Sequence, residues 1–271
     1  SGRKNLVKIE SGFTVSLSHK INELIQGDEH FLTGGTEAGI VLIDLESFNA
    51  EQKIPNAPLT NQFTAVTVLD DGRVVAGSKY GLAIKEDWGW RNIVETTLDD
   101  VIVHDSFDSN FFAADTIPVD FGGYIADLEQ RPDGLVYCAI RGTYPEPIRH
   151  GGGIIIIDVD NPSNFSIIDT TYLSYFTTSN NSNPYMVVKD LEFDSNGNLW
   201  VADAYATNKF EPLHVLNTDG VWGSFSAIPT SEGGILSLTT NTIAIDEWNR
   251  VWIGSFEDVV NDVGFIQYPN G

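Results

Sequence analysis

The sequence predicts an all-β fold, and within that class a β-propeller of five full repeats and one short partial repeat. Three observations lead to this prediction: one three-strand pattern recurs along the chain, its turns contain Asn-Gly or Asp-Gly pairs, and no segment shows helical periodicity. An antiparallel sheet of four strands cannot cover both of its apolar faces, so neighbouring sheets must stack against it. A ring of sheets leaves only short edges. A β-sandwich is the alternative, because it also contains many short strands.

The two C-terminal repeats are the clearest. In one, Leu191–Asp203 contains two strands around a polar turn, and Pro212–Leu216 forms a third strand. In the other, Thr242–Ser255 and Gly264–Tyr268 follow the same order. Both copies end the second strand in small residues and enter the third through Pro or Gly. Glycine in the first of these turns accepts the positive φ that a tight hairpin requires.

Three earlier stretches match the same pattern. The first has strands at 21–25, 31–35 and 39–44, and the second has strands at 65–69, 74–78 and 81–85. The third has strands at 124–130, 135–140 and 153–158. A sixth fragment has two strands, Val101–Asp105 and Phe111–Asp115, but no clear third strand. The interval from Phe112 to Tyr137 is too short for a complete blade, which needs about 40 residues. We therefore expect six blades, one of them degenerate, with five blades and an insertion as the alternative.

One domain is expected to span residues 1–271, because no Pro- or Ser-rich tract, charge block or change of composition marks a linker. The last repeat stops after its third strand. We expect an N-terminal segment, Asn5–Ile9 or Phe13–Leu17, to supply the missing outer strand and so close the ring.

Composition limits the classes of partner. The chain has 38 acidic and 15 basic residues, which gives a formal net charge of −23. A surface with this charge repels nucleic acid and anionic membranes, since both need clustered Lys and Arg. No apolar run is long enough to span a membrane. The single cysteine, Cys138, lies in an expected core strand and is interpreted as a buried, inert thiol. The oligomeric state is left open.

Strand order predicts where a binding site lies. If the strands of each blade are lettered a to d outward, the b–c loops and the d–a connections emerge on one face. The long excursions 141–152, 204–211 and 256–263 are b–c loops, and 171–185 is a d–a connection. Long loops on a rigid scaffold commonly carry binding residues. The candidate binding residues on this face are Arg141, Tyr144, His150, Tyr172, Tyr175, Tyr205 and Glu257, and beside them lie Arg149, Tyr185 and Lys209.

Tyrosine supplies rigid contact area with a polar end, which suits the recognition of a protein, peptide or glycan. The competing interpretation is that the loop tyrosines only pin their own loops to the ring.

Four aspartates are candidate metal ligands. Asp127 and Asp190 occupy matching positions at the start of strand a, and Asp115 and Asp203 match at the end of strand b. Several carboxylates near one mouth are the ligand type that Ca²⁺ prefers. Alternatively, each aspartate caps loop amides. No cofactor is required by these observations, and Ca²⁺ is the one kept open.

Catalytic signatures are weak. The five histidines show no metal-ligand spacing, and the chain lacks a G-x-S-x-G elbow, an H-E-x-x-H motif and a phosphate loop. His214 lies within an expected strand, where a structural role is the better interpretation. No catalytic residue is therefore assigned.

The phrases Phe193–Asp203 and Asn249–Ser255 resemble the two-component regulator propeller repeat. With Pro212–Trp222, the C-terminal part looks most like propellers associated with bacterial type IX secretion. This resemblance implies an exported protein, extracellular, periplasmic or on the bacterial cell surface, that serves as a sensor ectodomain or docking platform. The family offers no fixed catalytic residues to carry over.

A second resemblance competes with the first. The same Asn-Gly-Asn-Leu-Trp-Val-Ala-Asp phrase is similar to repeats of NHL-type and lactonase-like propellers, some of which hold a divalent metal for hydrolase or lyase chemistry. That resemblance implies Asp127, Asp190 and Asp203 as ligands and His150 as the base. We expect a non-enzymatic, exported propeller that binds a protein, peptide or glycan. The alternatives are a metal-dependent hydrolase or lyase and a structural adhesin spacer.

Overall fold

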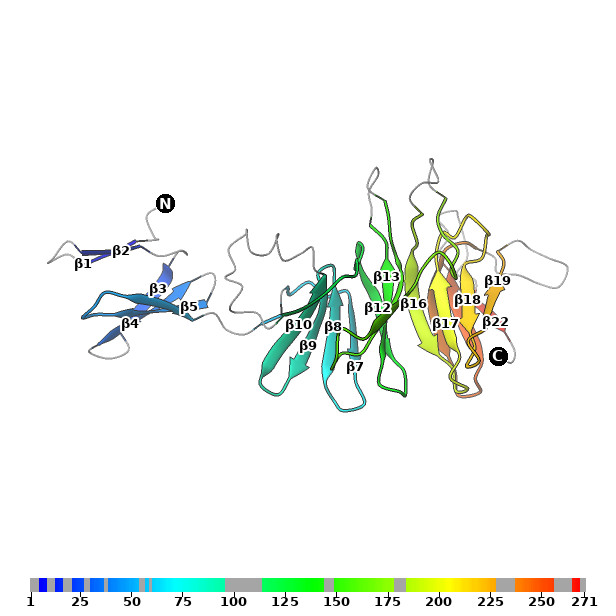
Figure 1. Cartoon of the computed structure of the whole chain (residues 1–271), viewed down its shortest axis with the longest axis horizontal. Helices are drawn as coiled ribbons and strands as arrows, with labels where there is room; N and C mark the ends of the chain where they lie inside the picture. Colours follow the sequence, from blue (N-terminus) through cyan, green and yellow to red (C-terminus); the bar gives the residue numbers. More distant parts are fainter. Residues whose placement is uncertain are drawn as a thin grey trace. The chain divides into compact units, whose positions relative to one another are not determined.

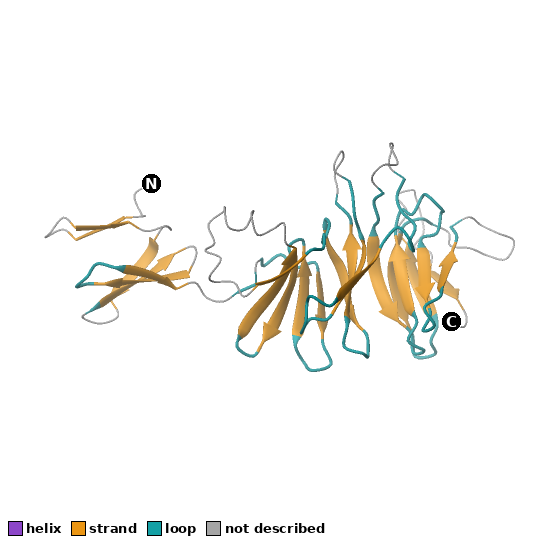
Figure 2. Ribbon diagram, in the orientation of Figure 1, coloured by secondary structure: helices purple, strands orange, loops and turns teal. Residues whose placement is uncertain are grey.

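The computed structural model describes residues 5–8, 13–16, 21–26, 30–36, 39–53, 57–58, 60–95, 114–143, 149–177, 184–227, 237–255 and 265–268. All regular structure in these ranges is β, comprising the strands β1–β22 (Figure 2). The predicted all-β class is confirmed. Within the same ranges no helix has the length and apolar character needed to cross a membrane.

The chain divides into two compact units: residues 1–57 with 108–111, and residues 58–107 with 112–271. Each unit is described by itself. The expectation that 1–271 forms one domain stays a prediction.

In the first unit, β1 (Asn5–Lys8) pairs antiparallel with β2 (Phe13–Ser16). The other four strands form one antiparallel meander, blade 1, made of β3 (Ile21–Gln26), β4 (Phe31–Thr36), β5 (Gly39–Asp44) and β6 (Ala50–Lys53). The core of blade 1 lies around the buried side chains of β5. Because the described strands β1 and β2 pair with each other, closure of a ring by either one stays a prediction.

The second unit contains four further sheets in chain order (Figure 1). Blade 2 consists of β7 (Ala65–Val68), β8 (Val74–Ser78), β9 (Gly81–Glu86), β10 (Gly89–Glu95) and β11 (Ala114–Ile117). Blade 3 consists of β12 (Tyr124–Gln130), β13 (Val136–Arg141), β14 (Gly153–Ile157) and β15 (Phe165–Ile168). Blade 4 consists of β16 (Val188–Phe193), β17 (Leu199–Asp203), β18 (Leu213–Leu216) and β19 (Trp222–Phe225). Blade 5 consists of β20 (Thr240–Ile245), β21 (Val251–Ser255) and β22 (Phe265–Tyr268).

The short sixth repeat is described only at its end. There β11 pairs in parallel with β10, with Asn92 opposite Ala114. The described strand of the partial repeat is thus the outermost strand of blade 2, and Val101–Asp105 lies outside the described residues. The described ranges contain five blade sheets, which is the smaller of the two expected counts.

The blades of the second unit pack face to face through their first strands. Strand β12 contacts β7, β8 and β16, and β16 contacts β20. One apolar cluster lies between blades 2 and 3, a second between blades 3 and 4, and a third between blades 4 and 5. This succession of stacked sheets of three to five strands, with adjacent inner strands, is the packing that the propeller prediction requires.

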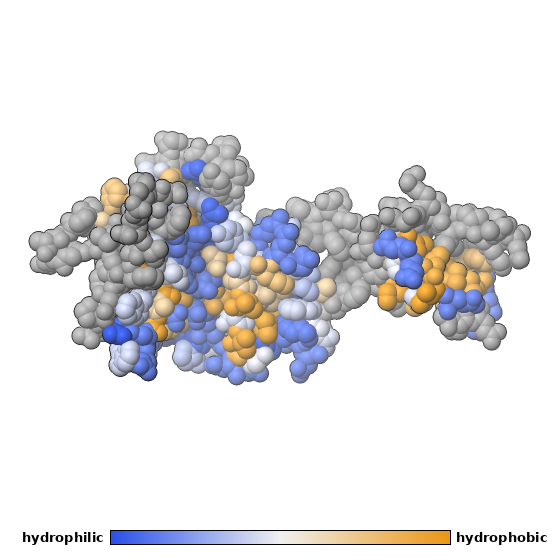
Figure 3. All heavy atoms as spheres, turned by 180° about the vertical axis from the view of Figure 1, so that it is seen from behind, coloured by the Kyte–Doolittle hydropathy of each residue, from blue (hydrophilic) through white to orange (hydrophobic). Residues whose placement is uncertain are grey.

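Strand β7 shows why a blade needs neighbours on both sides. Ala65 packs against the core of the second unit, while the alternating side chains of Val66 and Val68 are each 64% exposed. A strand that is apolar on both faces is typical of a sheet stacked between two others. Figure 3 shows one face of the molecule, on which apolar residues gather in patches bordered by hydrophilic ones.

The a–b turns follow one design. Gly72, Gly134 and Gly197 have φ values of 89°, 91° and 82°, and Asn249 occupies the matching place in blade 5 with φ of 60°. Only glycine, and to a lesser degree Asn, adopts this left-handed conformation at low cost. The Asp-Gly and Asn-Gly pairs therefore mark these turns correctly. Cys138 is free and buried, as expected, and burial raises the pKa of its thiol.

Candidate functional site

The long connections of blades 3 and 4 are joined to each other by main-chain hydrogen bonds. Gly142 N–H donates to Met186 O at 2.8 Å, and Ala204 N–H donates to Val187 O at 2.9 Å. Asn208 N–H donates to Tyr175 O at 3.1 Å. These bonds connect both described b–c loops to the d–a connection, and Figure 1 shows the three emerging at one end of the sheets. We call this surface the rim. Its fourth expected member, 256–263, lies outside the described residues.

A tyrosine with two cations lies where the rim meets the inner strands. The Tyr124 ring at the start of β12 has the Arg141 guanidinium 5.5 Å from its centroid and the Lys189 ammonium 5.8 Å from it. Lys189 Nζ also donates to the Tyr124 hydroxyl at 3.2 Å. Cations near a tyrosine ring are attracted by its quadrupole. Residues from blades 3 and 4 thus share one contact.

A second aromatic group continues the same cluster. Tyr185 packs edge to face against Phe176 with centroids 6.3 Å apart, and the Arg149 guanidinium lies 5.5 Å from the Phe176 centroid. Burial raises the pKa of the Tyr185 phenol, and Arg141 and Arg149 oppose this increase. We define the rim cluster as Tyr124, Arg141, Arg149, Tyr185 and Lys189.

His150 lies on the rim, where its Nε2 is 3.0 Å from Asp120 Oδ2. Both side chains are about half exposed, and pairs of this kind contribute at most about 1 kcal/mol. The backbone supports the contact, because Asp120 Oδ1 also accepts the Gly122 N–H at 2.7 Å. His150 therefore borders the rim cluster with a carboxylate partner of its own.

The predicted loop tyrosines are interpreted either as ligand-binding residues or as residues that pin their own loops to the ring, and their surroundings differ. Tyr172 is 51% exposed and stacks on Trp222 with centroids 6.3 Å apart. Tyr175 packs against the core between blades 3 and 4, and its N–H donates to Asn208 Oδ1 at 2.6 Å. Tyr205 has a positive φ of 62° and donates its N–H to Leu238 O. Tyr175 thus anchors a loop, whereas Tyr172 and Tyr205, which is 40% exposed, both present a ring to solvent. Tyr144 and Glu257 lie outside the described residues.

The structure brings Asp127 and Asp190 together on adjacent inner strands. Asp127 Oδ2 accepts the Leu191 N–H of blade 4 at 3.0 Å, and Asp190 Oδ2 accepts the Ile243 N–H of blade 5 at 2.6 Å. A register shift beside each aspartate, between 125 and 127 and between 188 and 190, creates this geometry. A β-bulge re-aims the side chain next to it. Both aspartates therefore connect neighbouring blades, which is the amide-capping role weighed against metal binding.

Carboxylates along these strands raise one another's pKa. Burial, reinforced by Asp127, raises the pKa of Asp190 to about 7, while the hydrogen bond from Ile243 opposes the increase. Burial raises the pKa of Glu129 to about 8, with further contributions from Glu192, Asp127 and Asp190. Protonated carboxylic acids near neutral pH can exchange protons with a ligand or with solvent.

Asp203 lies elsewhere, in the interior of blade 4. It and His214 are both fully buried, with His214 Nε2 3.5 Å from Asp203 Oδ2. His214 Nδ1 lies 2.9 Å from Ser224 Oγ on the next strand. Burial raises the pKa of Asp203, and His214 opposes this increase. The three residues form a polar row across strands β17, β18 and β19, which supports the structural interpretation of His214.

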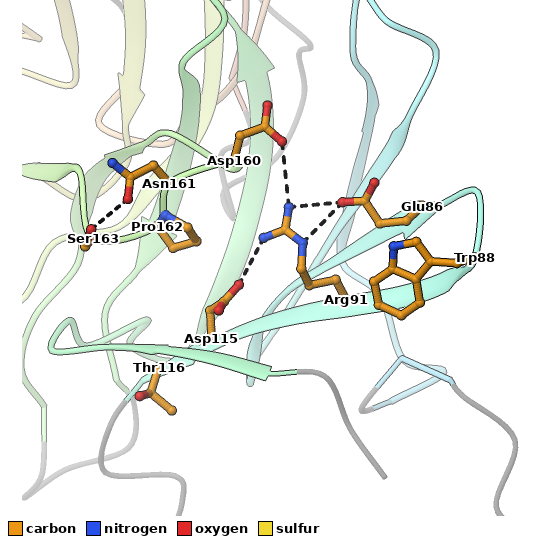
Figure 4. Close-up of a pocket in the computed structure, with 9 residues that line it drawn as sticks. All are labelled: Glu86, Trp88, Arg91, Asp115, Thr116, Asp160, Asn161, Pro162 and Ser163. Carbon is orange, nitrogen blue, oxygen red and sulfur yellow. Dashed lines mark hydrogen bonds and ion pairs between the residues drawn. The ribbon is translucent and has the colours of Figure 1, made fainter. Parts of the chain in front are cut away.

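Asp115 belongs to a different surface, a polar cleft between blades 2 and 3 (Figure 4). Its Oδ2 lies 3.0 Å from Arg91 Nη1, and Arg91 also pairs with Glu86 at 3.0 Å. Asp160 accepts two bonds from Arg73, at 2.7 and 2.9 Å. The cleft has a volume of about 820 Å³ and lies outside the rim. Its charged residues form an ion-pair network that joins the two blades.

These positions separate the four predicted metal ligands. Asp127 and Asp190 lie near each other, Asp203 is buried within blade 4, and Asp115 lies at the outer strand of blade 2. Within the described residues, no three or more His, Cys, Asp or Glu side chains form a group that could hold a metal ion.

Two members of the rim cluster were missed by the sequence reasoning. Tyr124 and Lys189 lie at the starts of two inner strands, not in the long loops themselves. Strand order could have indicated both residues, because the first residues of strand a lie at the same end of the blade as the b–c loops.

No family model matches the sequence, and no curated protein matches it. The fold is similar to several solved structures at low identity. One is the extracellular domain of what is described as a one-component system of Bacteroides thetaiotaomicron, with 16% identity over 97% of this chain and a TM-score of 0.47. PorZ, a surface component of the type IX secretion system of Porphyromonas gingivalis, has 14% identity over 90% of this chain and a TM-score of 0.43.

A catalytically inactive virginiamycin B lyase from Staphylococcus aureus, with quinupristin, has 13% identity over 90% of this chain and a TM-score of 0.43. The chain spans 29%, 32% and 68% of the lengths of these three proteins. The fold assignment rests on the strand order and the blade packing given above.

Proposed function

We propose that this chain is a non-enzymatic recognition module that binds a protein, peptide or glycan through the rim. The observation that carries the proposal is the rim cluster, in which cations and tyrosines from blades 3 and 4 converge. The connections that hold the cluster are hydrogen-bonded to one another, so the contact residues are held in place before a ligand arrives. Such preorganisation lowers the entropic cost of binding.

The rim cluster is rich in basic residues although the protein as a whole is strongly acidic. Only 15 of its residues are Lys or Arg, yet three of these, Arg141, Arg149 and Lys189, belong to the rim cluster. Arg and Tyr are also the residue types that dominate binding energy in recognition surfaces. We place the module outside the cytoplasm, at the bacterial surface, in the periplasm or in the extracellular medium, as the repeat resemblance implies.

Binding to arrays of glycans and peptides tests the proposal. The wild-type chain is compared with Arg141→Ala and Tyr172→Ala, and Trp248→Ala serves as the matched control. Trp248 is 66% exposed and lies on an a–b turn, which strand order places at the end opposite the rim. We expect both rim variants to lose captured ligands and the control to keep them. Equal losses in all three variants, or retention by both rim variants, would contradict the proposal.

A metal-dependent hydrolase or lyase is the second candidate, because Asp127 and Asp190 lie near each other and the pKa of Asp190 is raised. Addition of Ca²⁺ or Zn²⁺ would then raise the melting temperature of the wild type but not of Asp190→Ala. A melting temperature that the ions leave unchanged argues against this candidate. A spacer role would leave array binding unaffected by any rim variant.

A further inference from the structure

A solvent-exposed tryptophan lies at the polar cleft between blades 2 and 3. Trp88 occupies the two-residue turn that joins β9 to β10, and it is 62% exposed. Such turns usually consist of small or polar residues, so the turn itself does not require an indole. Among the residues that the structure describes, none makes a ring contact or a hydrogen bond with the Trp88 indole. Tryptophan is one of the residue types that contribute most to binding energy at recognition surfaces, so this free ring indicates a ligand.

The charged residues of the cleft hold one another in place. The Arg91 guanidinium donates to Glu86 Oε1 at 3.0 and 3.2 Å, to Asp115 Oδ2 at 3.0 Å and to the Val159 carbonyl at 2.7 Å. These bonds commit the arginine to the protein, so it is not offered to an anion. They also fix the orientation of two carboxylates. The second oxygen of each, Glu86 Oε2 and Asp115 Oδ1, accepts no hydrogen bond within the described part of the chain.

Free donors and an aromatic ring complete the lining. Figure 4 shows that the lining residues come from the β9–β10 turn, from β11 and from the turn between β14 and β15. Asn161 Oδ1 accepts the Ser163 hydroxyl at 2.7 Å, which orients the amide and leaves its N–H groups available. The cleft volume of about 820 Å³ is within the range of small-molecule sites, roughly 300–1,000 Å³. Such a lining suits a ligand with one apolar face and hydroxyl groups around its edge.

We propose that this cleft is a second binding site, separate from the rim, and that it takes an uncharged sugar. A sugar ring has a face of C–H groups, which stacks on the Trp88 indole, and hydroxyl groups at its edge. These hydroxyl groups donate to Asp115 and accept from the Asn161 amide. The β9–β10 and β14–β15 turns are c–d turns, which strand order places at the end opposite the rim. The inference therefore goes beyond the proposed function, because it gives the protein a ligand at each end of its blades.

The charges at the cleft favour an uncharged ligand. The carboxylates of Glu86, Asp115 and Asp160 are paired with the guanidinium groups of Arg73 and Arg91. An anionic ligand is repelled by these carboxylates and by the net charge of −23. A cationic ligand would have to compete with the arginines, and Arg73 already donates to both oxygens of Asp160 at 2.7 and 2.9 Å. Hydroxyl groups need only the oxygens that the arginines leave free, and hydrogen bonds to charged acceptors are the stronger ones.

An NMR titration of the full chain tests the proposal. The probes are three neutral disaccharides, cellobiose, maltose and diacetylchitobiose, and the cationic peptide trilysine. The indole N–H resonance of Trp88, assigned from its absence in Trp88→Phe, reports binding at the cleft. We expect at least one disaccharide to shift this resonance to saturation. The affinity should be the same at roughly 0.05 and 0.5 M salt, because salt screens only interactions between charges.

Three variants locate the bound sugar. Trp88→Ala should weaken binding about tenfold or more, because the stacking surface is lost. Asp115→Asn should weaken it several-fold, because a charged acceptor becomes a neutral one. Trp248→Ala is the matched control and should bind as the wild type does. Trp248 is 66% exposed, but the Arg250 guanidinium lies 4.4 Å from its ring centroid, on an a–b turn of blade 5.

Three results would overturn the assignment: no saturable shift with any of the disaccharides, equal effects of Trp88→Ala and Trp248→Ala, or tighter binding of trilysine than of every disaccharide. The last result would assign a cationic peptide to the cleft. The rim variant Arg141→Ala should leave sugar binding at the cleft unchanged. Failure of the cleft site is therefore distinguishable from failure of the proposed function, which depends on ligands that the rim variants lose.

Discussion

The Asp190 carboxylate in blade 4 accepts the main-chain N–H of Ile243 in blade 5, with Oδ2 and N 2.6 Å apart. Asp127 makes the equivalent bond from blade 3 to Leu191 in blade 4 at 3.0 Å. The Thr64 hydroxyl connects blade 2 to the Ile125 carbonyl of blade 3. One polar side chain from each of blades 2, 3 and 4 therefore bonds to the inner strand of the next blade. These bonds hold the inner strands at fixed spacing and so position the rim cluster above them.

Replacing the acceptor at the blade 4–blade 5 contact should destabilise the second unit. Asp190→Leu leaves the Ile243 N–H without its partner, which costs about 1–3 kcal/mol in the free energy of unfolding. Asp190→Asn is the matched control, because its amide oxygen can still accept the bond. Urea denaturation measures both variants. Equal free energies of unfolding for Asp190→Leu and the wild type would show that this hydrogen bond does not stabilise the second unit.

The carboxylates of the inner strands predict how stability depends on pH. The pKa values of Asp190 and Glu129 in the folded state, about 7 and about 8, lie above the ordinary values of 3.8 and 4.5. Between these limits the native state binds more protons than the unfolded state. The free energy of unfolding should therefore fall as the pH rises from about 4 to about 8.

Glu129→Gln should reduce this pH dependence, since the amide does not titrate. Thermal melting from pH 5 to pH 9, for the variant and the wild type, measures the effect. A wild-type melting temperature that rises over this range would refute the assignment of raised pKa values.

The a–b turn of blade 4 depends on one buried aspartate. Asp194 accepts the main-chain N–H groups of Asn196 and Asn198, the Asn198 side-chain amide at 2.8 Å, and the Trp200 indole N–H at 3.2 Å. Asp194→Ala leaves these donors without an acceptor and should lower the free energy of unfolding by at least about 2 kcal/mol. Asp194→Asn retains one acceptor oxygen and should have an intermediate effect in the same denaturation experiment. Identical unfolding curves for all three proteins would exclude the role given to this carboxylate.

The same turn shows what the sequence could reveal. Its Gly or Asn and its following strand repeat visibly, so the blades could be predicted. The side-chain pair across the turn varies: Asp194 with Trp200 in blade 4 is replaced in blade 3 by Arg131, which donates to the Tyr137 hydroxyl at 3.3 Å. Both blades have a hydrogen bond between these two positions, but the first residue accepts it in blade 4 and donates it in blade 3. The residue types alone do not reveal that the two pairs are equivalent.

The candidate site was predictable in part, for a similar reason. Counting strands leads to the rim for Arg141 and His150, because the chain alternates direction at every turn, and their role in binding stays a prediction. The partners of Arg141 could not be identified, since the Tyr124 and Lys189 contacts join residues of different strands and blades. Asp115 was matched to Asp203 by spacing within a partial repeat. The parallel pairing of β11 with β10 is a long-range contact that no local pattern encodes.

Hydrogen–deuterium exchange with a ligand selected from the arrays tests the role of the rim most directly. Binding should slow exchange in 141–143, 149–152 and 184–189 and leave the a–b turns 70–73, 131–135 and 194–198 unchanged. Slowed exchange confined to those turns, with the rim segments unaffected, would contradict the account.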